Sequence, residues 1–411
     1  MTKLEELIAK LCPDGVEYKT LTELFDTKNG YTPSKSKEEY WTNGTVPWFR
    51  MEDIRENGGI LSKAIQYVSE SAIKGSLFPA DSIIVATSAT IGQHALNKVP
   101  SLANQRFTYL VLKDEFKEQI DIMFIYYCCF KLDEYCKECL NQGNFASVDM
   151  KKFLKFKFPV PPLEVQREIV RILDNFTFLS AELAAELAAR QKQYEYYKEY
   201  LFENHISDVE WKRLDELFPF IRNGFVGTIK SFFTNEIDGI RYLEGTNIHD
   251  GVISDNEILY VTKEFHEKHI KNQLKADDIL MVQSGHIGEC AVVGKKYEGA
   301  NCHALIIMSN GGECLSKYYV YYFHTLKGFK SLTPAITGGT IKHVLAGKVG
   351  KIKVPVPPLE VQQRIVDILD RFDTLCNDIS NGLPAEIKLL KKQYEYFRDK
   401  LLTFKELKKE A

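Results

Sequence analysis

The segment Pro159-Val-Pro-Pro-Leu-Glu-Val-Gln-Arg-Glu-Ile-Val-Arg-Ile-Leu-Asp174 returns 196 residues later as Pro355-Val-Pro-Pro-Leu-Glu-Val-Gln-Gln-Arg-Ile-Val-Asp-Ile-Leu-Asp370. A match of this length does not arise by chance, and such self-similarity governs how the rest of a chain is interpreted. A second block, Lys192-Gln-Tyr-Glu-Tyr-Tyr197, returns as Lys392-Gln-Tyr-Glu-Tyr-Phe397, with four residues gained between the blocks. The chain therefore contains one architecture written twice.

Weaker echoes of the repeat lie in front of each block. Glu17-Tyr-Lys-Thr-Leu-Thr-Glu-Leu-Phe25 parallels Glu210-Trp-Lys-Arg-Leu-Asp-Glu-Leu-Phe218, and an Asn-Gly pair follows each segment, at Gly30 and Gly224. The polar stretches differ most between the copies. The two halves therefore share a fold and diverge in their surface loops.

Each half is predicted to be a mixed globular domain followed by one long helix. Short β-rich runs such as 82–86 and 107–112 alternate with Gly and Asn turns. The segments 119–139 and 314–332 are predicted helices rich in aromatic residues, and such a stripe at helical spacing usually packs in the core.

After Pro162 and Pro358 the pattern changes to a heptad-like helix. Roughly 35 to 40 residues at about 1.5 Å each give a helix of about 50 to 60 Å. Each helix is the natural partner of the other, and an antiparallel pair makes a pseudo-two-fold dimer from one chain. The predicted seam consists of Ile169, Ile172, Phe176, Leu179, Leu183, Leu187 and Tyr194 in the first helix, and Ile365, Ile368, Phe372, Leu375, Ile387, Leu390 and Tyr394 in the second.

The two helices differ at their centres. The first carries Ala181-Glu-Leu-Ala-Ala-Glu-Leu-Ala-Ala-Arg190, which is built from strong helix formers. The second carries Ser380-Asn-Gly-Leu-Pro384 at the corresponding place, where Gly and Pro predict a kink or a break.

The predicted fold class is α+β, with two mixed α/β domains separated by an antiparallel coiled coil of two long helices and related by an internal pseudo-two-fold repeat. The predicted boundaries are 1–158 for domain 1, 159–204 for the first helix, 205–354 for domain 2 and 355–411 for the second helix.

Composition narrows the class of protein. In 411 residues there is no run of roughly 20 apolar residues, and the first residues lack the pattern of a signal peptide, so a cytoplasmic protein without a membrane partner is expected. Nine scattered cysteines favour reduced core thiols over a disulfide framework. Cys136 and Cys139 form a lone CxxC without a second ligand pair, so no metal site is expected.

Catalytic motifs are missing from the sequence. Ala346-Gly-Lys-Val349 lacks the upstream glycine and the hydroxyl residue of a phosphate-binding loop. The double prolines belong to the repeat and not to an amino-methyltransferase motif. Pro13-Asp-Gly-Val-Glu-Tyr-Lys19 mimics a nuclease carboxylate pattern but is compressed into seven residues, and it is interpreted as a coincidence. The chain is therefore predicted not to be an enzyme.

The paired Pro-Val-Pro-Pro-Leu-Glu-x-Gln blocks, the Ala-Glu-Leu repeat and the Lys-Gln-Tyr-Glu-Tyr ends resemble the conserved regions of specificity subunits of Type I restriction-modification systems. The resemblance covers the whole chain in layout. It implies two target recognition domains, each reading one half of a bipartite site on double-stranded DNA. It also implies two methyltransferase subunits on the helices and two motor-nuclease subunits in the full complex. No cofactor is expected in this chain, because S-adenosylmethionine and ATP with Mg²⁺ would belong to those partners.

Two alternatives stay open. The chain could be a two-headed scaffold whose domains bind proteins or glycans, or a specificity subunit that serves a fused methyltransferase-nuclease partner. A net charge of −3 is unusual for a protein that binds nucleic acid without partner subunits. Phosphate contacts must therefore come from local clusters of positive charge or from partner subunits.

Base reading needs directed donors and acceptors held on turns, whereas phosphate contacts need mainly Lys, Arg and backbone amides. The divergent polar loops therefore supply the DNA-binding candidates. They are Lys35, Lys37, Trp48, Arg50, Ser88, Thr90, Gln105, Arg106 and Asn144 in domain 1, and Arg241, Gln283, Ser284, His286, His303, Thr340 and Lys342 in domain 2. The phosphate-contact candidates precede the proline blocks and are Lys151, Lys152, Lys155, Lys157, Lys348, Lys351 and Lys353.

Arginines at 50 and 106 suit guanine, and Gln105 and Asn144 suit adenine. Because Arg106 in one half corresponds to Ala304 or His303 in the other, the two half-sites are predicted to differ in sequence.

Overall fold

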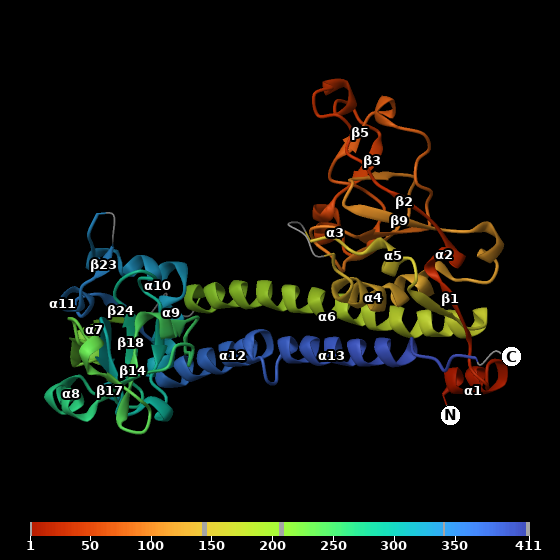
Figure 1. The fold of residues 1–411 in the computed structure, drawn as a ribbon. Coiled ribbons are helices and arrows are strands. Elements are labelled where there is room, and N and C mark those ends of the chain that lie inside the picture. The colour runs from red at the N-terminus through yellow and green to blue at the C-terminus, as the bar shows by residue number, and fades with distance from the viewer. Residues whose placement is uncertain (1, 142–145, 205–208, 340–341, 408–411) are drawn as a thin grey trace. The chain divides into compact units, whose positions relative to one another are not determined.

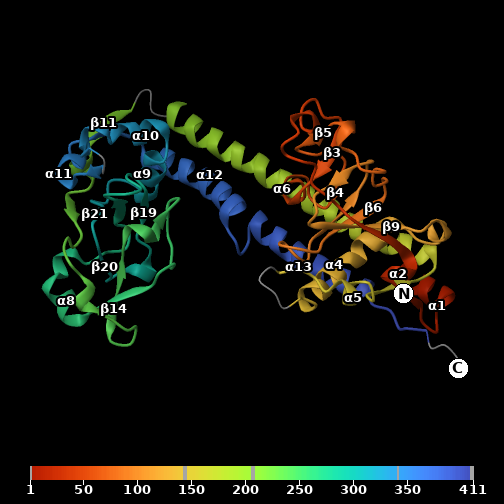
Figure 2. The ribbon, with the colours of Figure 1, turned by 45° about the horizontal axis from the view of Figure 1, so that its top comes forward.

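The computed structural model describes residues 2–141, 146–204, 209–339 and 342–407 (Figures 1 and 2). The chain divides into two compact units. Unit 1 comprises Met1–Glu182 and Ile387–Ala411, and unit 2 comprises Leu183–Glu386. The long helix α6 (Leu163–Asn204) contributes its first half to unit 1 and its second half to unit 2.

Unit 1 is built around a five-stranded sheet of order β2-β9-β6-β7-β4 and a three-stranded sheet of order β5-β3-β8. Before α6 its elements are α1 (Lys3–Leu11), β1 (Glu17–Thr20), α2 (Leu21–Leu24), β2 (Phe25–Asn29), β3 (Val46–Phe49), α3 (Met51–Asn57), β4 (Ile60–Leu61), β5 (Tyr67–Val68), β6 (Ser82–Ala86), β7 (His94–Asn97), β8 (Leu102–Ala103), β9 (Phe107–Leu112), α4 (Ile122–Glu138), α5 (Met150–Phe153) and β10 (Lys157–Val160). The strands predicted at 82–86 and 107–112 are confirmed as β6 and β9.

The larger sheet of unit 1 is covered on both faces. Successive side chains of a strand point to opposite faces, so Ile83 and Val85 of β6 join the core around α4, while Ile84 and Ala86 join a second core under β3 and β8. A strand with two buried faces is apolar along its length, which explains the continuous run Ile83-Ile-Val-Ala86.

Unit 2 repeats this plan with a four-stranded sheet of order β12-β21-β18-β19 and a second sheet of order β13-β17-β14-β20. Its elements are β11 (Glu210–Arg213), α7 (Leu214–Leu217), β12 (Phe220–Asn223), β13 (Phe233–Thr234), β14 (Gly239–Leu243), β15 (Ile248–His249), β16 (Val252–Ile253), β17 (Leu259–Thr262), α8 (Lys263–Lys268), β18 (Ile279–Val282), β19 (Cys290–Val292), β20 (Asn301–Cys302), β21 (Leu305–Ser309), α9 (Ser316–Phe323), α10 (Leu326–Ser331), β22 (Ile336–Thr337), β23 (His343–Val344), α11 (Ala346–Val349), β24 (Lys353–Val356) and α12 (Leu359–Asn377).

The echoes in front of the proline blocks have a structural role. In unit 1, β1 pairs antiparallel with β10, with Glu17 opposite Val160. In unit 2, β11 pairs with β24 in the same register, with Glu210 opposite Val356. The first strand of each domain therefore pairs with the proline-block strand at the end of that domain.

The Gln of each repeated block is buried and ties the long helix to its domain. The Gln166 side chain accepts a hydrogen bond from the Asp121 N–H (2.9 Å) and donates to the Gln119 and Pro161 carbonyls (2.9 and 2.7 Å). In unit 2, Gln362 accepts from the Leu315 N–H (2.9 Å) and donates to the Pro357 carbonyl (2.8 Å).

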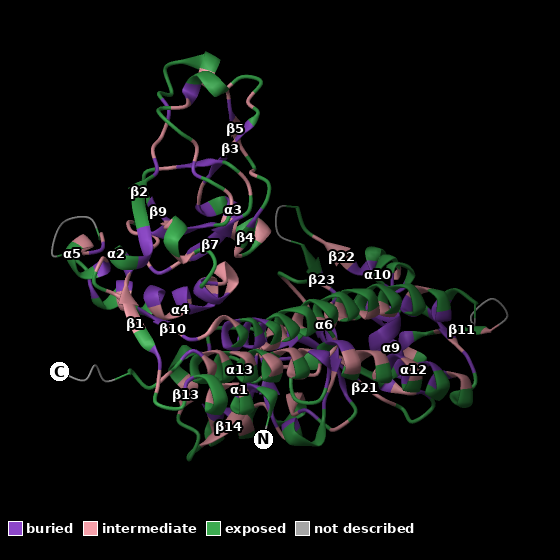
Figure 3. Cartoon of the chain, turned by 90° about the vertical axis from the view of Figure 1, so that its right-hand side faces the viewer, coloured by how far each residue is buried: buried purple, intermediate pink, exposed green. Residues whose placement is uncertain are grey.

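The aromatic helices are confirmed as core elements, and Figure 3 shows buried residues gathered on α4 and α9. One detail of the prediction is wrong, because 314–332 forms two helices. Thr325 begins α10 by accepting the Gly328 N–H (3.0 Å), and a Cβ on Gly328 would lie 1.8 Å from the Tyr322 carbonyl oxygen. Glycine at this position permits the close approach of the two helices.

The long helices differ as the sequence predicts. The 42 residues of α6 are continuous and about 63 Å long at 1.5 Å per residue. The second copy is broken between α12 and α13 (Leu383–Leu401). Asp378 accepts the Ser380 N–H (2.7 Å) in this break, and a Cβ on Gly382 would lie 2.4 Å from the Thr374 carbonyl oxygen. The predicted interruption is confirmed.

Aromatic side chains pair the helices within each unit. In unit 1, Phe176 of α6 stacks on Phe397 of α13, with ring centroids 5.7 Å apart. In unit 2, Phe372 of α12 stacks on Tyr197 of α6 at 5.6 Å. This order of contacts is the one that antiparallel helices produce.

Not every predicted seam residue faces the other helix. Ile169 and Ile365 lie in the cores of the globular domains, because the first turns of each helix pack on the domain that precedes them. Leu179 is 46 % exposed.

The last described residues complete unit 1 and do not extend the helix predicted for 355–411. Leu402 is buried in the core of unit 1. The Val16 N–H donates to the Lys405 carbonyl (2.9 Å), and the Leu407 N–H donates to the Val16 carbonyl (2.9 Å). Both ends of the described chain therefore build the same unit.

All nine cysteines are free and buried. Cys136 lies in α4 and Cys139 is its C-terminal cap residue. Within the described ranges, no cluster of three or more His, Cys, Asp or Glu side chains is arranged to hold a metal ion. The described helices include none with the length and apolar character needed to span a membrane.

Candidate nucleic-acid interface

A polar cavity opens in domain 1 where β3 and β8 end. It has a volume of about 840 Å³, and we call it the domain 1 cavity. Five of the residues predicted to bind DNA line it, namely Lys35, Trp48, Arg50, Gln105 and Arg106. These residues come from separate segments of the chain, and the fold brings them together.

Arg50 is held at the centre of this site by its backbone. It follows β3 directly and donates its N–H to the Asp53 carboxylate (2.7 Å). Asp53 is fully buried and also accepts the Ile65 N–H (2.6 Å). The Arg50 guanidinium lies 5.6 Å from the centre of the Trp48 ring, and no carboxylate of the described residues forms an ion pair with it. A rigid backbone thus presents a guanidinium whose terminal nitrogens are available to a ligand.

Gln105 and Arg106 lie on the turn after β8. The Asn104 N–H donates to the Phe49 carbonyl (3.0 Å), and the Arg106 N–H donates to the Asn104 side-chain oxygen (3.0 Å). The Gln105 and Arg106 side chains are exposed, and Gln105 accepts a hydrogen bond from Thr32. The turn is therefore fixed beside Arg50 while its side chains stay accessible.

The remaining candidates of domain 1 lie outside this cavity. Lys37 is exposed and donates to the Tyr40 hydroxyl (3.1 Å). Ser88 and Thr90 lie on the turn after β6, where Ser88 forms a β-bridge with Ser147. Asn144 lies outside the described residues.

Domain 2 has the same framework at the corresponding position. The strand β14 pairs in parallel with β20, with Leu243 opposite Cys302, as Phe49 is opposite Ala103 in domain 1. The next residue is Glu244, which the sequence reasoning missed. Its N–H donates to the Asn247 side-chain oxygen (2.9 Å), and Asn247 is buried.

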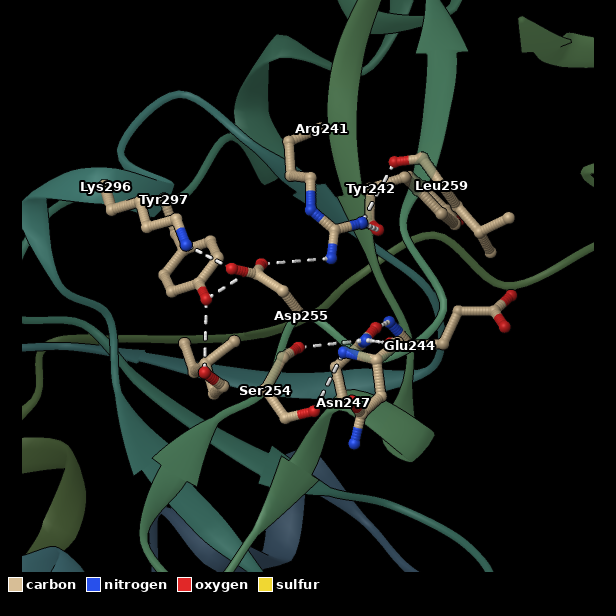
Figure 4. A network of polar contacts seen from close by, with 11 residues as sticks. Arg241, Tyr242, Glu244, Asn247, Ser254, Asp255, Leu259, Lys296 and Tyr297 are labelled. Atoms are coloured by element: carbon tan, nitrogen blue, oxygen red, sulfur yellow. Dashed lines mark hydrogen bonds and ion pairs between the residues drawn. The ribbon is translucent and has the colours of Figure 1, made fainter. Parts of the chain in front are cut away.

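Arg241, a predicted DNA-binding residue, is tied into a polar network (Figure 4). Its guanidinium donates to the Tyr242 and Leu259 carbonyls (2.8 and 3.1 Å) and lies 3.6 Å from the Asp255 carboxylate. A hydrogen bond from Lys296 is the main reason that the pKa of Asp255 is lowered. Arg241 therefore has fewer donors to offer to a ligand than Arg50.

The other candidates of domain 2 lie on loops at the ends of strands. His303 follows β20 and its Nδ1 is 3.3 Å from the Tyr242 hydroxyl. Gln283 and Ser284 follow β18, and the Ser284 backbone forms a β-bridge with His343. His286 and Lys342 are exposed, and Thr340 lies outside the described residues.

The predicted phosphate contacts are exposed in both units. Lys151 and Lys152 lie on α5 and Lys348 lies on α11, while Lys155, Lys157, Lys351 and Lys353 lie beside or on β10 and β24. Lys157 pairs with Glu406 (2.9 Å). A recurring exposed lysine cluster at the end of each domain is compatible with contact to a polyanion.

The chain contains two copies of one mixed domain, each followed by a long helix and each with polar side chains on its loops. This arrangement defines a protein with two recognition domains. The family model described as the Type I restriction modification DNA specificity domain matches the chain twice, over residues 13–189 and 206–389. The chain belongs to this family.

Several relatives share this assignment. The chain is similar to the specificity subunit of the Type I restriction enzyme EcoprrI of Escherichia coli, with 38% identity over 89% of this chain and 90% of the relative. It is also similar to the EcoR124I/EcoR124II specificity subunit of the same organism, with 32% identity over 78% of this chain and 84% of the relative.

Solved structures share the fold. A chain from a study of complex assembly and conformational transition of the type I R-M system matches with a TM-score of 0.66 and 19% identity, over 96% of this chain and 98% of that chain. The HsdS subunit from Thermoanaerobacter tengcongensis matches with a TM-score of 0.58 and 18% identity, over 96% and 97%. The predicted fold class and the predicted class of protein are confirmed, and none of these matches favours the scaffold alternative.

Proposed function

We propose that each domain of this chain reads one half of a bipartite site on double-stranded DNA. The observation that carries the proposal is the domain 1 cavity, where Arg50, Gln105 and Arg106 present directed donors and acceptors from fixed backbone positions. Such side chains discriminate base edges in the major groove. The family match in both halves supports one reading domain per half-site.

The paired helices are proposed to bind two methyltransferase subunits through the same residues in each unit. Tyr196 of α6 and Tyr396 of α13 are 62% and 61% exposed, and Tyr197 and Phe397 beside them are 41% and 38% exposed. Exposed aromatic residues are enriched in protein interfaces. A patch that occurs twice suits two copies of one partner.

This chain is proposed to carry no catalytic step of its own. Adenine methylation with S-adenosylmethionine would belong to the methyltransferase subunits. ATP- and Mg²⁺-dependent cleavage would belong to two motor-nuclease subunits or to a fused partner. The complex would work in the cytoplasm, where the DNA lies.

The test is to co-express the chain with the methyltransferase subunit of its own system and to map adenine methylation across a genome by single-molecule sequencing. We expect a split motif with two unequal halves. A stable complex that methylates without sequence preference would contradict the proposal and favour the scaffold alternative. The methyltransferase expressed alone is the control.

A further inference from the structure

The residue that follows the parallel strand pair occupies the same place in both domains. Arg50 follows β3 and Glu244 follows β14, and each precedes a helical turn. Their backbone angles agree closely, at φ −133° and ψ 176° for Arg50 and φ −122° and ψ 171° for Glu244. Each donates its N–H to a buried side chain three residues later, Asp53 or Asn247. The two residues are therefore structural equivalents.

The neighbouring contacts support this equivalence. The residue after β8, Asn104, donates its N–H to the carbonyl of Phe49 (3.0 Å). The residue after β20, His303, donates in the same way to Leu243 (2.8 Å). The backbone framework around the two positions is thus conserved between the domains, while the side chains have opposite charge.

Neither charged group is neutralised by a partner in its own domain. Within the described part of the chain, no ion pair includes Arg50 or Glu244, and the Arg50 Nε has no hydrogen-bond partner. In Figure 4 the Glu244 carboxylate points away from the network that binds Arg241. Both residues are half-buried, and Arg50 lines the domain 1 cavity.

We propose that Arg50 and Glu244 each read one base at the equivalent position of the two half-sites. Arg50 requires guanine there, and Glu244 requires cytosine. The proposal rests on the proposed function. A guanidinium donates two hydrogen bonds to guanine O6 and N7, whereas a carboxylate accepts one from the cytosine N4 amino group. A carboxylate gains nothing from DNA phosphates, because like charges repel. The Glu244 carboxylate therefore selects a base and does not raise the affinity for DNA of any sequence.

Rigid presentation is what makes these side chains selective. Asp53 accepts two backbone N–H groups, and the Asn247 side chain also donates to the Ser254 and Asn256 carbonyls (3.2 and 2.7 Å). Side chains on a fixed backbone lose less freedom on binding and tolerate a wrong base poorly. Arg241 is instead a positioning residue that keeps this loop in place through Asp255.

The test compares methylation motifs of the co-expressed complex for the wild-type chain, Arg50→Gln and Glu244→Gln. We expect Arg50→Gln to relax a guanine requirement in one half-site by roughly 5- to 150-fold in relative methylation, with the other half-site unchanged. Glu244→Gln should relax a cytosine requirement by the same order in the opposite half-site. Glu267→Gln, which changes an exposed carboxylate on α8 of the same domain, is the control and should leave every base preference unchanged.

The outcomes separate this inference from the proposed function. A wild-type motif that stays intact in both variants overturns the inference and leaves the proposed function standing. A wild-type chain without any motif overturns both. If Arg50→Gln fails to assemble, Arg50→Met keeps the length of the side chain without its hydrogen-bond donors, and it should relax the same guanine; an unchanged guanine requirement in that variant overturns the inference.

Discussion

The buried amide of Gln166 makes three hydrogen bonds, and Gln166→Met removes that amide while keeping a side chain of similar size. The Asp121 N–H and the Gln119 and Pro161 carbonyls then lose their partner, and each unsatisfied group costs about 1 to 2 kcal/mol at this burial. We expect the free energy of opening of unit 1 to fall by about 3 to 6 kcal/mol. The equivalent Gln362 makes two such bonds, so Gln362→Met should cost unit 2 about 2 to 4 kcal/mol.

Amide hydrogen exchange measured by mass spectrometry reads each unit separately, through peptides that cover α4 and α9. Gln363→Met is the control, because Gln363 is exposed and its amide contacts Asp367 one turn away. That change should stay within about 0.5 kcal/mol. The reasoning is refuted if Gln166→Met costs less than about 1 kcal/mol, or if Gln362→Met costs more than Gln166→Met.

Three further outcomes are expected. Burial lowers the pKa of His324, so the unfolded chain binds more protons below about pH 6.5 and stability falls as the pH drops. His324→Phe should reduce the dependence of the melting temperature on pH between about pH 7 and 5. An equal dependence in both proteins would contradict this. Lys348→Ala with Lys351→Ala should weaken binding to all DNA sequences and reduce the salt slope by about 1.8, seen in titrations from low to high salt; a changed base preference would exclude a phosphate role. Gly30→Ala should lower the melting temperature, because its Cβ would lie 2.3 Å from the Asn104 carbonyl oxygen; an unchanged value would show that the turn can move.

Much of the fold is encoded in signals that are local or repeated, and these the sequence predicts well. The duplication is visible because the same side chains meet the same backbone partners twice, as Gln166 and Gln362 do. The break before α13 follows from Gly382 and Pro384, whose effects act within one turn of helix. The aromatic cores of α4 and α9 follow from helical spacing.

The candidate site was predictable in part. Loops between buried strands suggested Arg50, Gln105 and Arg106, and the fold brings these residues to one cavity. Glu244 was not predicted, because an acidic residue is an unusual DNA contact and the sequence does not show that Glu244 is equivalent to Arg50. The signal that finds it is the spacing to Asn247, which matches the spacing of Arg50 to Asp53.

Sequence alone determined that the chain is duplicated, that each half ends in a long helix, and that one helix is interrupted, because the repeat can be read directly from the sequence and helix formation depends on residues close in the chain. The tertiary structure decided which charged side chains are free. Arg241 pairs with Asp255 and donates a hydrogen bond to the Leu259 carbonyl in the neighbouring strand, whereas Arg50 has no such partner among the described residues. Partners of this kind are brought together by strand pairing across the domain, and no local pattern encodes them.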